Sequence, residues 1–237
     1  MSDDAFSFLD EHIRRHIDFP DPWSRIAGLR TARQAIEDQL VFLRDQRGVQ
    51  VNAQLERFAG RLHPEDVEDK IDEYKTVVNE LFPKILRGGF VISLWSVYES
   101  SVKNIGEHVR KQKQLPFGLQ ELRAGDFLQQ VEVFFDRVLS LPPYPDKTVR
   151  KELEALKGLR NTLAHHDGST AELPKSLRSK TPNEYLKKGL HVFCDVHHEY
   201  VVPTEGYAAQ ALDLVAAHLE ALADRVYKAV YPAPLSK

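Results

Sequence analysis

Apolar residues recur every three or four positions along most of this chain, the spacing that places them on one face of an α-helix. This pattern predicts helices over residues 4–17, 23–47, 63–86, 90–110, 126–141, 148–165 and 207–231, with a shorter helical segment over 51–62. We expect Gly48 to end the second helix and Pro83 to bend the third. Gly88 and Gly89 are expected to form either a hinge or a point of close packing, and Asp126 to cap the helix that follows it.

The pattern changes after Gly168. Residues 170–182 are polar and are expected to form a loop, whereas residues 190–202 are rich in β-branched and aromatic side chains and predict one or two short strands. The fold class is therefore mainly α, with a small β-hairpin-like insertion before the last helix. Residues 1–62 are expected to form an N-terminal helical extension, and residues 63–237 the main helical domain.

Composition narrows the function classes without choosing one. The chain has 237 residues and a formal net charge of −3, whereas proteins that coat nucleic acids are strongly basic, so any nucleic-acid contact is expected to be local. A single cysteine, Cys194, excludes an internal disulfide and favours a reducing compartment. The longest apolar run, residues 90–98, is broken by serines and is too short to span a membrane. We expect a cytoplasmic protein with no membrane partner.

One arginine interrupts the apolar face of the helix over 148–165. Val149, Leu153, Leu156 and Leu163 follow helical spacing, and Arg160 falls where the next apolar residue is expected. A guanidinium on a buried face is costly without a partner. This placement predicts either a buried ion pair or a bound phosphate.

A second face of the same helix carries Glu154, Gly158, Asn161 and His165, which follow one another at four, three and four residues. Glycine inside a helix costs about 1 kcal/mol relative to alanine. Its presence at position 158 suggests that another backbone or a ligand comes close there.

Histidine and arginine together suit metal-free RNA cleavage. Histidine moves protons near neutral pH, and arginine binds a phosphate through two parallel hydrogen bonds. A two-fold dimer would supply the second histidine that an acid and a base require, and Gly158 would permit the close approach. His166 is a substitute, although it points about 100° away from His165 on an ideal helix. The alternative is that His165 only caps the helix end and that Arg160 pairs with Glu99.

The sequence Arg160-Asn161-x-x-x-His165 resembles the motif of the HEPN superfamily (higher eukaryotes and prokaryotes nucleotide-binding). The stretch 87–105 is similar to the long helix that precedes the motif helix in prokaryotic members, and the resemblance covers about residues 64–231. It implies a metal-independent ribonuclease, acting as a toxin or antiphage effector, in which the motif arginine and histidine meet across a homodimer. Those roles would fall on Arg160 and His165, with Asn161 as the polar residue after the arginine. Some members are inactive and serve as binding or scaffold modules.

Two further sets of residues have an ordinary and a functional interpretation. Glu99 and Lys103 form either a solvated ion pair or a site at which Glu99 orients Arg160. A basic run after the motif is either solvated surface or a contact for the RNA backbone. It consists of Lys175, Arg178, Lys180, Lys187 and Lys188.

A histidine-rich stretch suggests a third chemistry. His191, Asp195 and His197 would share one face of a strand, while Cys194 and His198 would share the other. These side chains are metal ligands in other proteins, but their spacing matches no closed zinc pattern. An exposed hairpin face is the favoured interpretation, so no metal and no cofactor are expected.

The leading hypothesis is a metal-independent endoribonuclease of HEPN type that cleaves RNA by 2′-hydroxyl attack at a composite dimer site. Its partners would be RNA, a second copy of the chain, and an antitoxin or sensor. Arg160, Asn161 and His165 would be the catalytic set, supported by Glu99, Gly158 and His166. The alternatives are a catalytically inactive HEPN-like module that binds a nucleotide or a protein, and a metal-dependent hydrolase that uses the 191–198 cluster.

Overall fold

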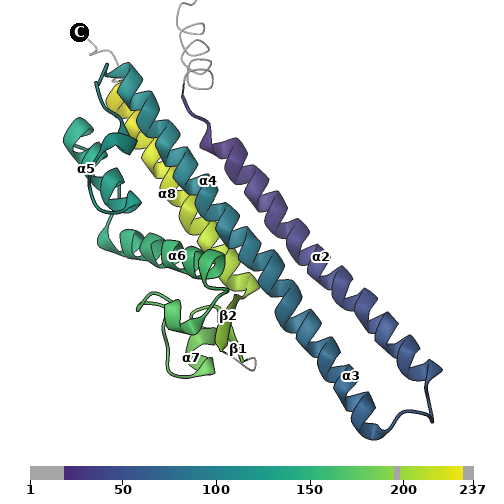
Figure 1. Ribbon diagram of the computed structural model, residues 1–237. Coiled ribbons are helices and arrows are strands. Elements are labelled where there is room, and N and C mark those ends of the chain that lie inside the picture. Colours follow the sequence, from purple (N-terminus) through teal and green to yellow (C-terminus); the bar gives the residue numbers. More distant parts are fainter. Residues whose placement is uncertain (1–18, 195–197, 232–237) are drawn as a thin grey trace, which may run out of the picture. The chain divides into compact units, whose positions relative to one another are not determined.

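The computed structural model describes residues 19–194 and 198–231, and it is mainly helical with a two-stranded antiparallel hairpin before the last helix (Figure 1). This confirms the predicted fold class. The helices are α2 (Pro22–Arg57), α3 (Pro64–Thr76), α4 (Phe82–Gln112), α5 (Phe127–Leu139), α6 (Lys147–His165), α7 (Pro182–Lys187) and α8 (Glu205–Val230). The strands are β1 (Leu190–Cys194) and β2 (Glu199–Pro203). The helix predicted over 4–17 lies outside the described residues.

The chain divides into two compact units, each assembled from segments that are distant in sequence. In its described part, unit 1 contains residues 19–28, 96–154 and 213–231, and unit 2 contains 29–95, 155–194 and 198–212. Helices α2, α4, α6 and α8 each continue from one unit into the other. The division into 1–62 and 63–237 stays a prediction, and its boundary falls in the turn between α2 and α3.

Unit 1 has a core built from the second half of α4, from α5 and from most of α8. Its fully buried apolar side chains come from all three helices, and they include Val102, Ile105, Leu128, Phe135, Leu219 and Val226. Helix α5 begins as predicted, because the Asp126 side chain accepts a hydrogen bond from the Gln129 backbone amide at 3.0 Å.

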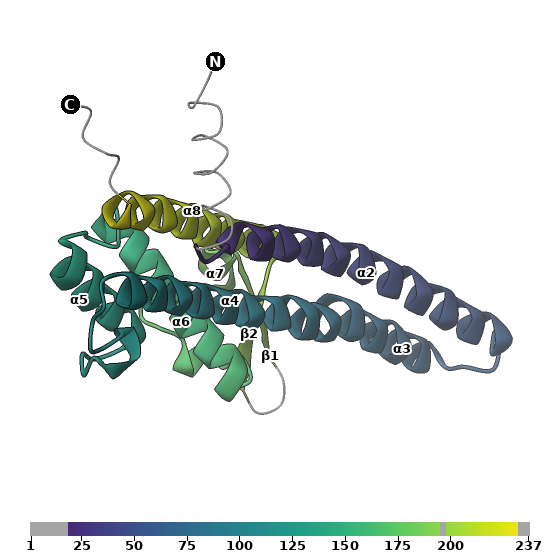
Figure 2. The ribbon, with the colours of Figure 1, turned by 90° about the horizontal axis from the view of Figure 1, so that it is seen from above.

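Helix α2 runs through Gly48, so the prediction that this glycine ends it is wrong. Gly48 faces α3, and a Cβ atom there would lie 3.4 Å from the Tyr74 hydroxyl, which is an ordinary contact distance. Arg47 and Glu73 form an ion pair at 3.1 Å across the same contact. Both ribbon views show α2 and α3 side by side in unit 2 (Figures 1 and 2).

The helices α3 and α4 form one continuous helical segment with a π-helical turn (Val77–Leu81) between them. Within that turn the amide of Phe82 donates to the carbonyl of Val77, five residues back. The wider turn ends two residues before Pro83, which has no amide proton to donate, and the helical segment continues past this proline. The predicted stop at residue 86 is therefore wrong, because Gly88 and Gly89 both lie inside α4. Gly88 faces Leu163, and a Cβ atom there would lie at an ordinary contact distance of 3.8 Å from the leucine side chain.

The β-hairpin is joined to the end of α6. Strands β1 and β2 are paired with His191 opposite Val202 and Phe193 opposite Tyr200. The Val201 amide donates to the carbonyl of Gly168 at 2.9 Å, and Gly168 has a positive φ of 78°. A Cβ atom at this position would lie 2.9 Å from the Val201 carbonyl oxygen, so glycine is required where the chain leaves α6 and meets the hairpin.

Among the described helices, none combines the length and the apolar character that a bilayer span requires.

Candidate functional site

The buried face of α6 differs by one position from the predicted face. Leu156 and Leu159 are buried, and so is Thr162, whereas Arg160 is only half-buried. From Leu156 a helical face continues through either the third or the fourth residue, and here it continues through Leu159. The prediction that Arg160 occupies a core position is therefore wrong. Arg160 lies beside this face and is half-buried.

The guanidinium of Arg160 is oriented by its sequence neighbour. Its Nη1 donates to the side-chain oxygen of Asn161 at 3.0 Å. Its Nε is buried and has no hydrogen-bond partner within the part of the chain that the structure describes. Glu99 accepts a hydrogen bond from Lys103 at 2.5 Å, which is the ordinary ion pair four residues apart on α4. We therefore assign the orientation of Arg160 to Asn161.

Gly158 is explained by a contact within the chain. A Cβ atom at this position would lie 2.7 Å from the Cγ of Pro174, closer than side chains approach one another. Of the two predicted partners, another backbone or a ligand, the structure shows the first: the loop after α6 comes close to Gly158 through the ring of Pro174. The Thr162 hydroxyl strengthens this contact, since it lies 3.0 Å from the carbonyl oxygens of both Gly158 and Glu172.

The last turn of α6 presents two exposed imidazoles. His165 and His166 are both exposed, and their ring centroids are 6.5 Å apart. The helix ends because the amides of His166 and Gly168 both donate to the carbonyl of Thr162 at 3.0 Å, with Asp167 and Gly168 in the left-handed region. On an ideal helix the directions of Arg160 and His165 differ by about 140°. One copy of α6 therefore does not aim both side chains at a single phosphate.

A polar cluster that the sequence analysis did not identify lies beside this turn. The Nζ of Lys84 donates to Asp167 at 2.7 Å and lies 4.1 Å from the centroid of the Tyr200 ring. The Tyr200 hydroxyl donates to Glu80 at 2.7 Å, and His198 is 3.9 Å from Asp167. These residues are up to 120 positions apart in sequence, so no local pattern indicates that they meet.

The predicted basic run divides into two groups. Arg178 donates to the carbonyls of Leu173 and Ala171 at 2.6 Å, and Lys188 donates to those of Ser176 and Arg178. These two side chains hold the loop after α6 in place. The other three, Lys175, Lys180 and Lys187, are exposed and remain suited to contact a phosphate backbone.

The histidine-rich stretch lies only in part within the described residues. Asp195 and His197 fall outside them, and Cys194 lies 3.8 Å from the carboxylate of Glu199. Among the described residues, no three histidine, cysteine or acidic side chains form a group suited to a metal ion.

No protein-family model, no curated protein and no solved structure matches this chain.

Proposed function

We propose that this chain is a metal-independent endoribonuclease of HEPN type whose active site is completed by a second copy of the chain. The observation that carries the proposal is the end of α6. There an arginine with an unsatisfied buried Nε is held by Asn161 next to a turn that exposes His165. A buried guanidinium nitrogen without a partner is costly, and a phosphate oxygen is an acceptor of the right kind to approach this group.

The chemistry assigns one role to each side chain. One His165 takes the proton from the 2′-hydroxyl, whose oxygen attacks the adjacent phosphorus. The bond from phosphorus to the 5′-oxygen breaks, and the leaving oxygen takes a proton from a second imidazole. Arg160 stabilises the charge that develops on the phosphate, and Asn161 holds the guanidinium of Arg160 in position. The products are a 2′,3′-cyclic phosphate and a 5′-hydroxyl.

The orientation of the two side chains favours a composite site. Because Arg160 and His165 point about 140° apart on one helix, a two-fold pairing is the simplest way to bring an arginine and two histidines to one phosphate. The same orientation favours a second candidate function. A chain that stays monomeric would present Arg160 and His165 to different ligands and would serve as a non-catalytic binding module.

Exposed lysines would supply the remaining affinity for RNA. Lys175, Lys180 and Lys187 follow the motif helix and have no structural role comparable to that of Arg178. Contacts of this kind release counterions, so binding would weaken as salt is raised. A role as a toxin or antiphage effector would follow from the same activity and would appear as growth arrest on expression that His165→Ala abolishes.

The test is cleavage of mixed structured and unstructured RNA by purified wild type, His165→Ala and His166→Ala in the presence of EDTA. Cleavage by wild type and His166→Ala, with loss in His165→Ala and with cyclic-phosphate ends, would support the proposal. Equal cleavage by all three would refute the assignment of His165. A monomer at the protein concentration of the assay, with no cleavage by any variant, would favour the binding module.

A further inference from the structure

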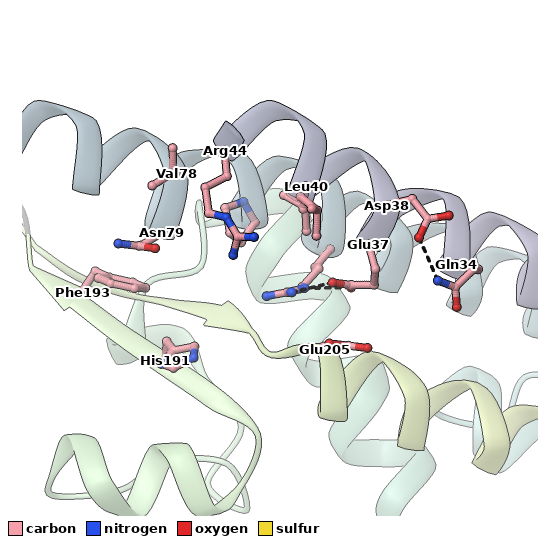
Figure 3. Close-up of a pocket in the computed structure, with 13 residues that line it drawn as sticks. Gln34, Glu37, Asp38, Leu40, Arg44, Val78, Asn79, His191, Phe193 and Glu205 are labelled. Carbon is pink, nitrogen blue, oxygen red and sulfur yellow. Dashed lines mark hydrogen bonds and ion pairs between the residues drawn. The ribbon is translucent and has the colours of Figure 1, made fainter. Parts of the chain in front are cut away.

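Unit 2 contains a cavity of about 640 Å³ between α2, the π-helical turn, the start of α4, strand β1 and the first residue of α8 (Figure 3). This volume falls within the range of pockets that hold metabolite-sized ligands. The residues of the Arg160 motif do not line it. The cavity is therefore a feature separate from the site proposed for RNA.

One end of the cavity gathers hydrogen-bond donors around an aromatic ring. Figure 3 shows the guanidinium of Arg44 reaching from α2 into the cavity, with Asn79 and Phe193 toward the same end and His191 beneath. The Nε of Arg44 is 3.5 Å from Asp45, a distance at the limit of a hydrogen bond. Among the described residues, no acceptor is bonded to its two Nη groups, which leaves the fork available to a ligand.

The floor of the cavity is a rigid ion pair. Arg87 donates from Nε and Nη2 to the two carboxylate oxygens of Glu37 at 2.9 and 2.5 Å, and their side chains are only 17% and 11% exposed. Such a bidentate pair fixes both groups and cancels the charge of Glu37. Partial burial, and then the charge of Arg87, lower the pKa of His191, so this imidazole is neutral at pH 7 and offers one donor and one acceptor.

The opposite end of the cavity is acidic. Asp38 accepts a hydrogen bond from Gln34 at 2.9 Å, and Glu205 lies 3.8 Å from Arg33, which makes a weak ion pair. Figure 3 shows Gln34, Asp38 and Glu205 at the end away from Asn79 and Phe193. Carboxylates accept hydrogen bonds from hydroxyl groups. Asp38 and Arg44 are six residues apart on α2, which corresponds to about 9 Å along the helix axis.

We propose that this cavity binds a small phosphate monoester of a hydroxylated ring. Donors from three different elements, Arg44, Asn79 and His191, suit the several oxygens of a tetrahedral phosphate better than the two coplanar oxygens of a carboxylate. The ring would lie against Phe193, and its hydroxyl groups would donate to Asp38 and Glu205. This assignment does not depend on ribonuclease activity.

Calorimetric titration with ribose 5-phosphate, inorganic phosphate and ribose tests the proposal on the full chain. Ribose 5-phosphate is expected to bind at least tenfold more tightly than either of the other two, because only it engages both ends of the cavity. Ribose binding as tightly as ribose 5-phosphate would refute the anion site. Inorganic phosphate binding as tightly would refute the assignment of the acidic end to hydroxyl groups.

Two arginines on the same helix provide a matched pair of variants. Arg44→Gln is expected to weaken the binding of ribose 5-phosphate at least tenfold, whereas Arg30→Gln, an exposed position on α2 outside the cavity, is expected to leave it unchanged. NMR titration of His191 gives an independent readout, because a bound phosphate raises the pKa of an imidazole beside it. Equal binding by the two variants, or a pKa of His191 that saturating ribose 5-phosphate does not raise, would overturn the proposal.

Discussion

Lys84 and Asp167 form an ion pair at 2.7 Å although 83 positions separate them in sequence. Asp167 directly follows His165 and His166 and adopts a positive φ of 50°, so the pair joins the first turn of α4 to the turn that ends α6. The lysine also lies against the ring of Tyr200, which is itself held by Glu80. Contacts from two other segments of unit 2 thus hold the turn that directly follows the two imidazoles.

Lys84→Gln is expected to slow RNA cleavage several-fold while changing the free energy of unfolding by less than about 1 kcal/mol, since exposed ion pairs contribute little to stability. Asp167 is 68% exposed and Lys84 is 20% exposed, so solvent screens this pair from the side of the carboxylate. Lys75→Gln, which removes the 2.7 Å pair with Asp72 on α3, is the control and should leave cleavage unchanged. Cleavage rates measured alongside urea unfolding separate the two effects. Equal rates for both variants would exclude a positioning role for Lys84.

Gly158→Ala is expected to destabilise the protein by about 1–3 kcal/mol despite the higher helix propensity of alanine. The new methyl group would meet the rigid ring of Pro174 at 2.7 Å. Gly89→Ala is the matched control, because Gly89 also lies in a helix but has no atom within 4 Å of its Cβ position. The free energy of unfolding of that variant should rise by about 0.5–1 kcal/mol, because alanine favours the helix more than glycine does. Chemical denaturation measures both changes, and a loss of the same size in both would mean that Pro174 is not the cause.

Thr162→Val is expected to lower the free energy of unfolding by about 1–3 kcal/mol, because valine keeps the shape of threonine but removes the hydroxyl. The Glu172 carbonyl would lose its contact with that hydroxyl, and the loop after α6 would lose one of its attachments. Thr162→Ser keeps the hydroxyl, so it should lower the free energy of unfolding by less than Thr162→Val does. Hydrogen exchange of residues 170–174 provides the local readout, and unchanged exchange in the valine variant would contradict this account.

His218 is expected to make unit 1 sensitive to acid. Burial lowers the pKa of this histidine to about 4, and its Nε2 lies 3.0 Å from the Pro143 carbonyl oxygen, so Nε2 carries the proton of the neutral ring. Since the unfolded chain has the higher pKa, it takes up a proton first as the pH falls. The free energy of unfolding is therefore unaffected by His218 above about pH 6.5. It falls progressively as the pH is lowered toward 4, by up to about 3 kcal/mol.

The pH dependence of unfolding in His218→Gln tests this account. The variant should lose stability at pH 7 but show a shallower decline between pH 6.5 and 4 than wild type. An unchanged slope in His218→Gln would assign the acid sensitivity to other groups.

Helical spacing predicted most of the fold because amphipathic faces depend on local sequence. The starts of α3, α5 and α6 and the position of the hairpin follow the predicted pattern closely. The errors came from glycines. Gly48, Gly88 and Gly158 resemble interruptions or openings in the sequence, but Gly48 faces Tyr74, Gly88 faces Leu163 and Gly158 faces Pro174. Of these contacts, only the one between Gly158 and Pro174 is too close for a Cβ atom, and the local sequence around Gly158 does not contain Pro174.

The candidate site was predictable only as far as the motif itself. Arg160 and Asn161 are neighbours in sequence, so their hydrogen bond needs no tertiary contact. The exposure of His165 follows from its place at the helix end. The choice between Leu159 and Arg160 for the core was not predictable, because both satisfy the helical period. The Lys84–Asp167 and Arg87–Glu37 pairs join distant segments and required the three-dimensional structure.

The π-helical turn at Val77–Leu81 has a consequence for insertions and deletions. Within five residues it brings Asn79 to the cavity and Glu80 to Tyr200. Deleting one residue there would let an ordinary α-helix run straight through, and circular dichroism would register almost no change. Because the turn accommodates one extra residue, the helix before the deletion would keep nearly the same rotation relative to α4, and only side chains within the turn would change direction. What the extra residue sets is therefore the directions of Asn79 and Glu80, and a deletion would remove those two contacts while leaving the flanking helices in place.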